Sequence, residues 1–444
     1  MLNEPASSRH DQPVVRAAAT PSPDDQLQAD LRAQVATVLA IQAEVFTPTE
    51  DEPHPPLLAP SRLVATFEGA LLLESEAAYD KLDALLAPSN HFPVFRPARP
   101  ERGEGHGPHI VQIISGRINP APRAWWPNVL LFIATLFSLL LVGTDLALGE
   151  IASSNPFLAM QLSANPLAQL WRGLPYALSL LLILGAHELG HYFAARWHRL
   201  AVTLPYFIPL PFISLFGTMG AFIQLRQPMK NRKMLLDVGA SGPLAGLVFA
   251  VPILLIGLTS TRLIPILPGG VYEGDSVVYA LAKILVFGRF VPDGQVDVCI
   301  NCSQLAWAGW TGLLVTALNL IPIGQLDGGH VLYALVGERA RRLFYPLLAA
   351  MIALVFFTDV WLFWVLLLLI FGRVYATPLD TITPLDRRRR AVAVLALVVF
   401  VLIFVPAPLA PVGRSPLVPL PGGSSAGLLP LVALGLVAAR RWRR

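Results

Sequence analysis

The stretch Leu184-Gly185-Ala186-His187-Glu188-Leu189-Gly190-His191 places a metal-binding pattern inside an apolar segment, and the rest of the chain is interpreted from it. An apolar run over 175–183 leads directly into it. On a helix, His187 and His191 are four positions apart, so their imidazoles lie on one face and can share a zinc ion. Glu188 lies beside them, where a carboxylate can accept a proton from zinc-bound water. The sequence therefore predicts a catalytic zinc site within a membrane helix.

The same stretch has a purely structural interpretation. Five-residue patterns of this kind occur by chance in long chains, and a cluster of polar side chains can also tie helices together. Histidine and glutamate are costly in hydrocarbon, however, and are retained there mainly where they perform a function. The apolar setting therefore favours the metal site over the structural cluster.

Composition places the chain in a membrane. It has 444 residues, of which 54% are hydrophobic and 14% are charged, whereas soluble domains carry about 25% charged residues. The net charge of +4 is too small to indicate a nucleic-acid partner. Positive residues cluster beside apolar segments instead, as in membrane proteins. We expect a polytopic α-helical membrane protein that contacts the lipid bilayer and binds no nucleic acid.

The region before the first apolar segment divides into three parts. Residues 1–24 are rich in proline, alanine, serine and aspartate and are expected to be disordered. Residues 25–61 are expected to form an amphipathic helix, extending to about Phe46, and a proline-rich linker. Residues 62–116 combine strand-like segments with a helical segment from Ser75 to Leu86. This combination predicts a small cytoplasmic α/β domain.

Residues 125–405 are expected to form the intramembrane domain. About eight transmembrane helices are predicted, at approximately 129–142, 174–195, 238–258, 305–320, two within 343–373, 392–405 and 428–439. The last of these is weak and follows a Pro/Gly-rich loop within 406–444. A polar loop is expected over 145–172. The apolar segment 201–228 is interrupted by prolines and glycines, which predicts a re-entrant β-hairpin or loop.

A second motif offers a third metal ligand. Catalytic zinc keeps three protein ligands and one water molecule, and the first motif provides two of the ligands. Asp327 follows the fourth predicted span, at the same cytoplasmic level as the two histidines. Gly328 and Gly329 follow it and permit a close approach of the backbone. An ordinary turn aspartate is the alternative interpretation.

Two other features remain open from the sequence. Cys299 and Cys302 are the only cysteines, and one Cys-x-x-Cys pair cannot complete a four-ligand zinc site. In the expected external loop 259–304 they form either a structural disulfide or a redox sensor. His330, after the Asp-Gly-Gly turn, either acts next to the metal or is an ordinary interfacial histidine.

The two motifs together resemble those of the site-2 protease family of intramembrane zinc metalloproteases. That family pairs H-E-x-x-H on one helix with N-x-x-P…L-D-G on another, which correspond here to 187–191 and 319–328. The similarity is strong over about 175–335 and looser over about 62–405. The N-terminal α/β unit and the segment Pro378…Thr383-Pro384-Leu385-Asp386 resemble the plastid and cyanobacterial branch. No PDZ-like insertion is evident, which departs from the regulated-sigma-factor branch. The resemblance implies that Zn²⁺ is the cofactor, and the residues it assigns to the metal site are the ligands His187, His191 and Asp327 and the general base Glu188.

The resemblance also implies how a substrate is held. Asn319 would hold the substrate backbone or the oxyanion, and the segment containing Gly217 and Gly220 would pair with the substrate as an edge strand. The implied reaction is hydrolysis of peptide bonds in or near the transmembrane segments of membrane-protein substrates, as in regulated intramembrane proteolysis. The alternative is a catalytically silent chaperone or scaffold that binds membrane helices, although such a protein has no need of a complete zinc site.

The beginning of the chain bears on its location. The first 25 residues lack an apolar segment and include acidic residues, which argues against a cleaved signal peptide and an organelle transit peptide. We therefore expect the plasma membrane of a bacterium rather than a plastid membrane. The substrate, the regulatory signal and the oligomeric state have no signature in the sequence.

Overall fold

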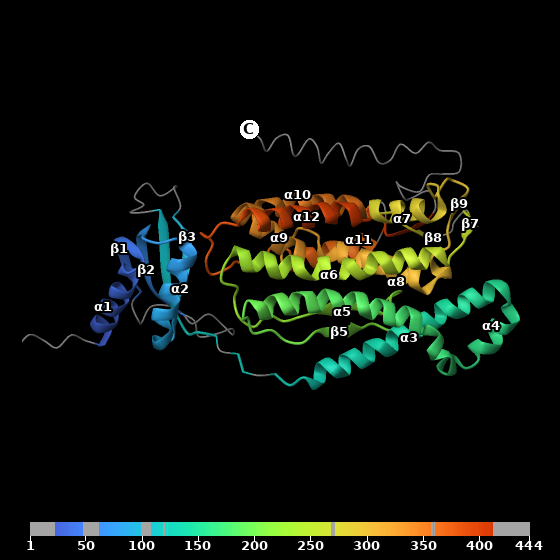
Figure 1. Ribbon diagram of the computed structural model, residues 1–444, viewed down its shortest axis with the longest axis horizontal. Coiled ribbons are helices and arrows are strands. Elements are labelled where there is room, and N and C mark those ends of the chain that lie inside the picture. Colours follow the sequence, from blue (N-terminus) through green and yellow to red (C-terminus); the bar gives the residue numbers. More distant parts are fainter. Residues whose placement is uncertain are drawn as a thin grey trace, which may run out of the picture. The chain divides into compact units, whose positions relative to one another are not determined.

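The computed structural model (Figure 1) describes these residues: 23–47, 62–98, 108–118, 120–121, 123–267, 271–356, 358 and 360–411. The chain divides into two compact units, Met1–Arg117 and Ile118–Arg444. Most of the terminus expected to be disordered (1–22), the proline-rich linker (48–61) and the last expected span (428–439) lie outside the described residues.

The first unit contains a four-stranded antiparallel sheet with strand order β1-β2-β4-β3. Its core includes Leu31, Phe67, Leu82 and Phe95, all at most 1% exposed. Its elements, in chain order, are α1 Pro23–Ala36, β1 Leu39–Phe46, β2 Arg62–Leu71, α2 Ser75–Leu86, the 3-10 turn η1 Ala87–Ser89, β3 His91–Pro97 and β4 His109–Ser115.

The amphipathic helix expected to reach Phe46 is too long. Helix α1 ends at Ala36, and the following residues form β1, which pairs with β2 from Leu39↔Leu71 to Phe46↔Ala65. Leu39, Ile41 and Val45 fit a pleated strand because β-branched and apolar residues alternate there with polar ones. Pairing with residues 19 to 32 positions further along the chain therefore overrides the local helical pattern.

The second unit is mainly helical. Its helices, including 3-10 turns, are α3 Trp126–Ser154, α4 Pro156–Ser163, η2 Pro166–Gly173, α5 Leu174–Trp197, α6 Arg232–Thr259, α7 Val277–Phe287, η3 Ile300–Cys302, α8 Gln304–Asn319, α9 Asp327–Val336, η4 Gly337–Arg339, α10 Ala340–Val355, α11 Val360–Phe371 and α12 Arg387–Ile403. Among the described residues, three segments are long and apolar enough to cross a membrane: 126–154, 166–197 and 232–259. The expected total of about eight spans stays a prediction.

The polar loop expected over 145–172 is largely helical. Helix α3 continues to Ser154, and α4 and η2 follow it. The break between α3 and α4 lies at Asn155-Pro156, where the Asn155 side chain accepts a hydrogen bond of 3.0 Å from the Leu158 amide. Proline in the first turn of a helix sacrifices no hydrogen bond. The polar residues in this region therefore mark helix ends rather than one long loop.

The interrupted segment 201–228 forms a β-hairpin, as expected from its prolines and glycines. Strands β5 Tyr206–Pro209 and β6 Thr218–Phe222 are antiparallel. Gly217 precedes β6 with φ of 76°, and a Cβ there would approach the Ser138 carbonyl oxygen to 3.0 Å. Only glycine meets both demands without strain. The end of the hairpin loop thus packs against the middle of α3.

Helices α5, α6 and α8 lie side by side (Figure 1). Glycines bring α5 and α6 into close contact. A Cβ on Gly242 would lie 2.1 Å from His191 Nε2, and a Cβ on Gly246 would lie 3.2 Å from His187 Cβ. Small residues allow such approach between membrane helices. Helix α6 therefore covers the face of α5 that carries the histidines.

The segment between α6 and α8 is more ordered than the loop expected there. Besides α7, it contains β7 Leu263–Pro265, β8 Val271–Glu273 and β9 Val296–Val298, and β8 pairs with β10 Leu409–Pro411. Cys299 and Cys302 form a disulfide beside η3. The Lys283 ammonium, which is fully buried, lies 2.7 Å from Asp275 Oδ1 and 3.2 Å from Asp297 Oδ1.

Candidate metal centre

Helix α5 holds three polar side chains in a buried position. His187, Glu188 and His191 are 3%, 4% and 6% exposed. The surrounding sequence is apolar and lacks internal proline after residue 175, so the helix continues through all three residues. One helical turn separates the histidines, and both rings therefore lie on the same face.

Asp327, the first residue of α9, completes the group. The chain turns sharply between α8 and α9, and glycines make this turn possible. A Cβ on Gly328 would lie 1.9 Å from the Leu320 carbonyl oxygen, and one on Gly329 would lie 2.3 Å from the Gly324 carbonyl oxygen. The turn brings Asp327 to His187 across 140 positions of sequence. The sequence prediction that these glycines permit close approach is confirmed.

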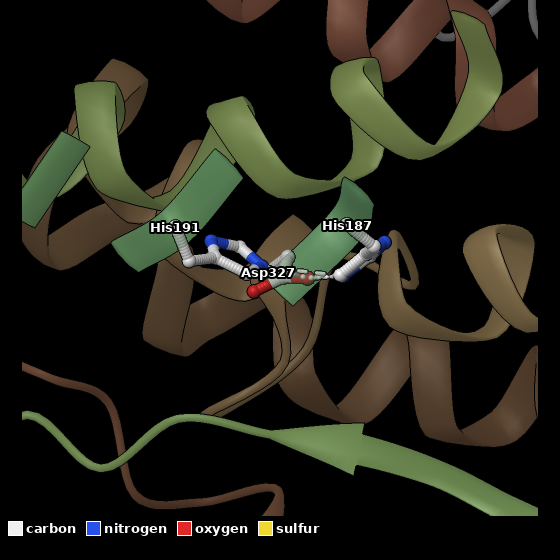
Figure 2. A group of neighbouring side chains, drawn as sticks. All are labelled: His187, His191 and Asp327. Atoms are coloured by element: carbon white, nitrogen blue, oxygen red, sulfur yellow. Dashed lines mark hydrogen bonds and ion pairs between the residues drawn. The ribbon is translucent and has the colours of Figure 1, made fainter. Parts of the chain in front are cut away.

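The three side chains converge on one point (Figure 2). His187 Nε2, His191 Nε2 and Asp327 Oδ2 are each 3.2 Å from the other two atoms. A tetrahedral zinc ion with bonds of about 2.0–2.1 Å holds its ligand atoms about 3.3–3.4 Å apart. The observed triangle therefore has the dimensions of one face of a zinc coordination tetrahedron. Within the described part of the chain, His187, His191 and Asp327 form the cluster of histidine, cysteine or acidic residues that could hold a metal ion.

Hydrogen bonding orients one ligand for the metal. His191 Nδ1 lies 2.7 Å from the Val238 carbonyl oxygen of α6. A carbonyl oxygen only accepts, so Nδ1 carries the proton and Nε2 of the neutral ring presents a lone pair. That lone pair faces the Asp327 carboxylate at 3.2 Å. A zinc ion between these two acceptor atoms would satisfy both, so the residues fit Zn²⁺. A carbonyl partner on the second ring nitrogen is typical of metal-bound histidine.

A cavity of about 250 Å³ opens onto this group. Glu188 lines it, and the backbone amide of Ile223 faces the Glu188 carboxyl. The carboxyl is not part of the converging triangle, so it is available to move a proton. The cavity is lined by residues from α5, α6, α9, the end of β6 and the α8–α9 turn: His187, Glu188, His191, Ala221, Phe222, Ile223, Leu225, Val238, Gly239, Asn319, Gln325, Leu326, Asp327 and His330.

The structure brings Asn319 into the site but places the two hairpin glycines differently. Asn319, at the end of α8, has its Nδ2 atom 3.3 Å from His187 Nε2. Gly217 packs against α3, and neither it nor Gly220 lines the cavity; the hairpin contributes 221–223 instead. His330 lines the cavity and donates from Nδ1 to the Leu326 carbonyl oxygen at 2.9 Å.

Two contributors to the site were not found from the sequence. The Val238 carbonyl has no sequence signature, because every residue carries one. Gln325 lines the cavity, and its position two residues before Asp327 is the only signal that could have indicated it.

Comparisons with known proteins agree with this geometry. The model of peptidase family M50 matches residues 175–362. The rice protein named probable zinc metalloprotease EGY2, chloroplastic, is 28% identical over 91% of this chain and 73% of its own length. The Arabidopsis thaliana protein of the same name is 33% identical over 54% of this chain and 43% of its own. Arabidopsis probable zinc metalloprotease EGY1, chloroplastic, is 29% identical over 65% and 54%. No solved structure matches the chain.

Proposed function

We propose, from the premise that this chain is a membrane-bound zinc metalloprotease with a peptidase family M50 domain, that it hydrolyses peptide bonds in or near transmembrane segments of other membrane proteins. One observation carries the proposal. His187 and His191 lie on α5, within a segment long and apolar enough to cross a membrane, and Glu188 and Asp327 line the same cavity. A substrate must therefore reach the site from within the bilayer or from its surface.

The side chains around the cavity have different roles in hydrolysis. Zinc, when bound by His187, His191 and Asp327, supplies a Lewis acid that activates water and the scissile carbonyl. Glu188 accepts a proton from the attacking water and later delivers it to the leaving amine. Asn319 Nδ2 points into the same space and is placed to donate a hydrogen bond to the oxyanion.

The hairpin offers the substrate a backbone partner. Strands β5 and β6 form a two-stranded sheet, and no other described strand pairs with β6. A transmembrane helix hides its peptide bonds in its own hydrogen bonds, and its unwound backbone needs new partners in an apolar environment. Pairing with β6 satisfies these groups and leads the substrate past 221–223 into the cavity. Gly220, whose α-carbon faces open space, contacts the substrate in this arrangement, whereas Gly217 shapes the hairpin loop.

We propose that this proteolysis takes place in a plastid-type membrane. The relatives described above are named chloroplastic. The bacterial plasma membrane expected from the sequence has no support among them. Regulated intramembrane proteolysis is likewise part of the proposal.

Replacing the base tests the proposal. Glu188→Gln preserves size and hydrogen bonding but removes the proton acceptor, so we expect normal zinc content and at least about a hundred-fold slower cleavage. Cleavage of a helical membrane substrate is measured in proteoliposomes, with metal content measured by mass spectrometry. Glu150→Gln, an exposed position in α3, is the matched control. Normal cleavage by Glu188→Gln would contradict the assignment, and substrate held but not cut by the wild type would support the scaffold alternative.

A further inference from the structure

A second cavity, separate from the metal centre, lies where two candidate spans end. It has a volume of about 270 Å³ and is bounded by the start of α3, the end of α5 and the base of the hairpin. Arg123, Arg196 and Arg226 line it, together with Trp125 and Tyr206, and no acidic residue does. Three positive charges therefore surround one cavity at a membrane boundary.

The charges of these arginines are not neutralised within the described part of the chain. Arg123 donates to Gln224 Oε1 at 3.0 Å, and Arg226 donates to the Ala121 carbonyl oxygen. The Arg196 side chain has no hydrogen bond or ion pair to any described residue. Neutral partners leave the full charge of each guanidinium in place. Such a cluster attracts an anion, and it does so more strongly next to the low-dielectric bilayer than in bulk water.

The position of the cavity identifies the anion. The first span candidate begins at Trp126 and the second ends at Trp197, so the cavity lies at the level where the apolar core gives way to the headgroups. Trp125 is 66% exposed, and exposed tryptophan and tyrosine are characteristic of this interfacial level. The anions concentrated there are lipid phosphates, and the guanidinium fork matches phosphate oxygens in a bidentate manner.

We propose that this arginine cavity binds the phosphate group of an anionic phospholipid. The lipid would hold three parts of the chain together, because its ligands come from the segment just before α3, from α5 and from the base of the hairpin. The two arms of the hairpin base join at the bridge Val202↔Leu225, and both arms line the cavity. A bound lipid therefore fixes the base of the hairpin. The end of strand β6, at 221–223, belongs to the same hairpin and borders the metal centre.

Lipid retention by the purified full-length protein tests the proposal. The protein is equilibrated with vesicles of phosphatidylcholine containing phosphatidylglycerol, and bound lipids are counted by native mass spectrometry. Arg196→Gln is the informative variant, because it removes charge without removing a side-chain hydrogen bond or ion pair to a described residue. Attraction to anionic lipid is about 1 kcal/mol per arginine, so we expect about five-fold weaker phosphatidylglycerol binding. Arg196→Lys keeps the charge and should therefore bind phosphatidylglycerol more strongly than Arg196→Gln does.

Arg388→Gln is the matched control, because Arg388 is an exposed arginine outside this cavity. It should retain phosphatidylglycerol as the wild type does. Equal retention by wild type and Arg196→Gln would overturn the proposal, as would equal loss in Arg388→Gln. A separate arm adds inorganic phosphate in detergent. Displacement of phosphatidylglycerol by an equimolar amount of phosphate would assign the cavity to a soluble anion and refute the lipid.

Discussion

Adding a single methyl group at Gly242 should damage the zinc site from a neighbouring helix. A Cβ there would lie 2.1 Å from His191 Nε2, whereas ordinary contact begins at 3.4 Å. The ring or the helix must therefore move by about 3.4 − 2.1 = 1.3 Å. Metal–ligand distances tolerate only about ±0.2 Å. Loss of a ligand's positioning contacts typically weakens metal binding by 10–100-fold, and we expect Gly242→Ala to fall at or beyond the upper end of this range.

Two other glycines of the same helix pair calibrate this prediction. A Cβ on Gly246 would lie 3.2 Å from His187 Cβ, which requires a shift of only 3.4 − 3.2 = 0.2 Å, and Gly185 has open space around it. Gly246→Ala should therefore bind zinc slightly more weakly than the wild type, and Gly185→Ala should bind it equally well. Without steric conflict, alanine stabilises a helix by about 0.5–1 kcal/mol relative to glycine.

The assay is a chelator competition that reports the zinc dissociation constant of each variant. Thermal unfolding in the presence of excess zinc shows whether each variant is folded. The order Gly185→Ala, Gly246→Ala, Gly242→Ala should be the order of increasing dissociation constant. Wild-type zinc affinity in Gly242→Ala would refute the structure of the α5–α6 contact, and so would an equal loss in Gly185→Ala.

Three further predictions concern other parts of the molecule. Asn319→Ala should slow single-turnover cleavage by about 10²–10³-fold if Asn319 stabilises the oxyanion, with unchanged zinc content; loss of zinc would instead make it a support for the metal site. Cys299 and Cys302 should react with a maleimide only after reduction, because they form a disulfide; labelling of the unreduced protein would contradict this. Burial, followed by the charge of Asp297, raises the pKa of Glu273 from 4.5 to about 8, and burial raises that of Asp275 to about 6 despite the nearby Lys283. Between the ordinary pKa of each group and its raised pKa, the folded protein binds more protons than the unfolded chain. Each group therefore lowers the free energy of unfolding as pH rises through its own interval, by at most about 1.4 kcal/mol per pH unit. Melting temperatures from pH 5 to 9 should fall with pH, and less steeply for Glu273→Gln; an identical slope in that variant would exclude Glu273 as the titrating group.

The candidate metal ligands can be picked out from the sequence because histidine and aspartate are unusual within apolar segments. His187, His191 and Asp327 lie in apolar surroundings, and polar residues in such surroundings are expensive. The spacing of the two histidines places both rings on one face of a helix. The glycines after Asp327 allow its backbone to approach that face closely. The distance of 140 positions between His187 and Asp327 was no obstacle, because zinc chemistry requires a third ligand regardless of where it lies in the chain.

Features that depend on tertiary contacts could not be predicted in the same way. The helical pattern up to Phe46 is indistinguishable from a strand until β2 pairs with it. The glycines of the hairpin were assigned together to the substrate, yet Gly217 is needed against α3 and lies outside the cavity. Glycine has no side chain to reveal its neighbour, so its role depends entirely on which backbone approaches it.

The segment of α6 from Val238 to Pro243 determines the geometry of the site as much as the two metal-binding motifs do. The carbonyl of Val238 orients His191, the missing side chain of Gly242 makes room for the same ring, and a Cβ on Gly239 would collide with His330 Cβ at 2.8 Å. Pro243 has no amide hydrogen, so the Gly239 carbonyl lacks its helical donor four residues on. Gly239 lines the cavity, so the backbone of α6 forms part of the cavity wall. None of these contributions comes from a metal-binding side chain, and the first three depend on α6 lying in contact with α5 and α9.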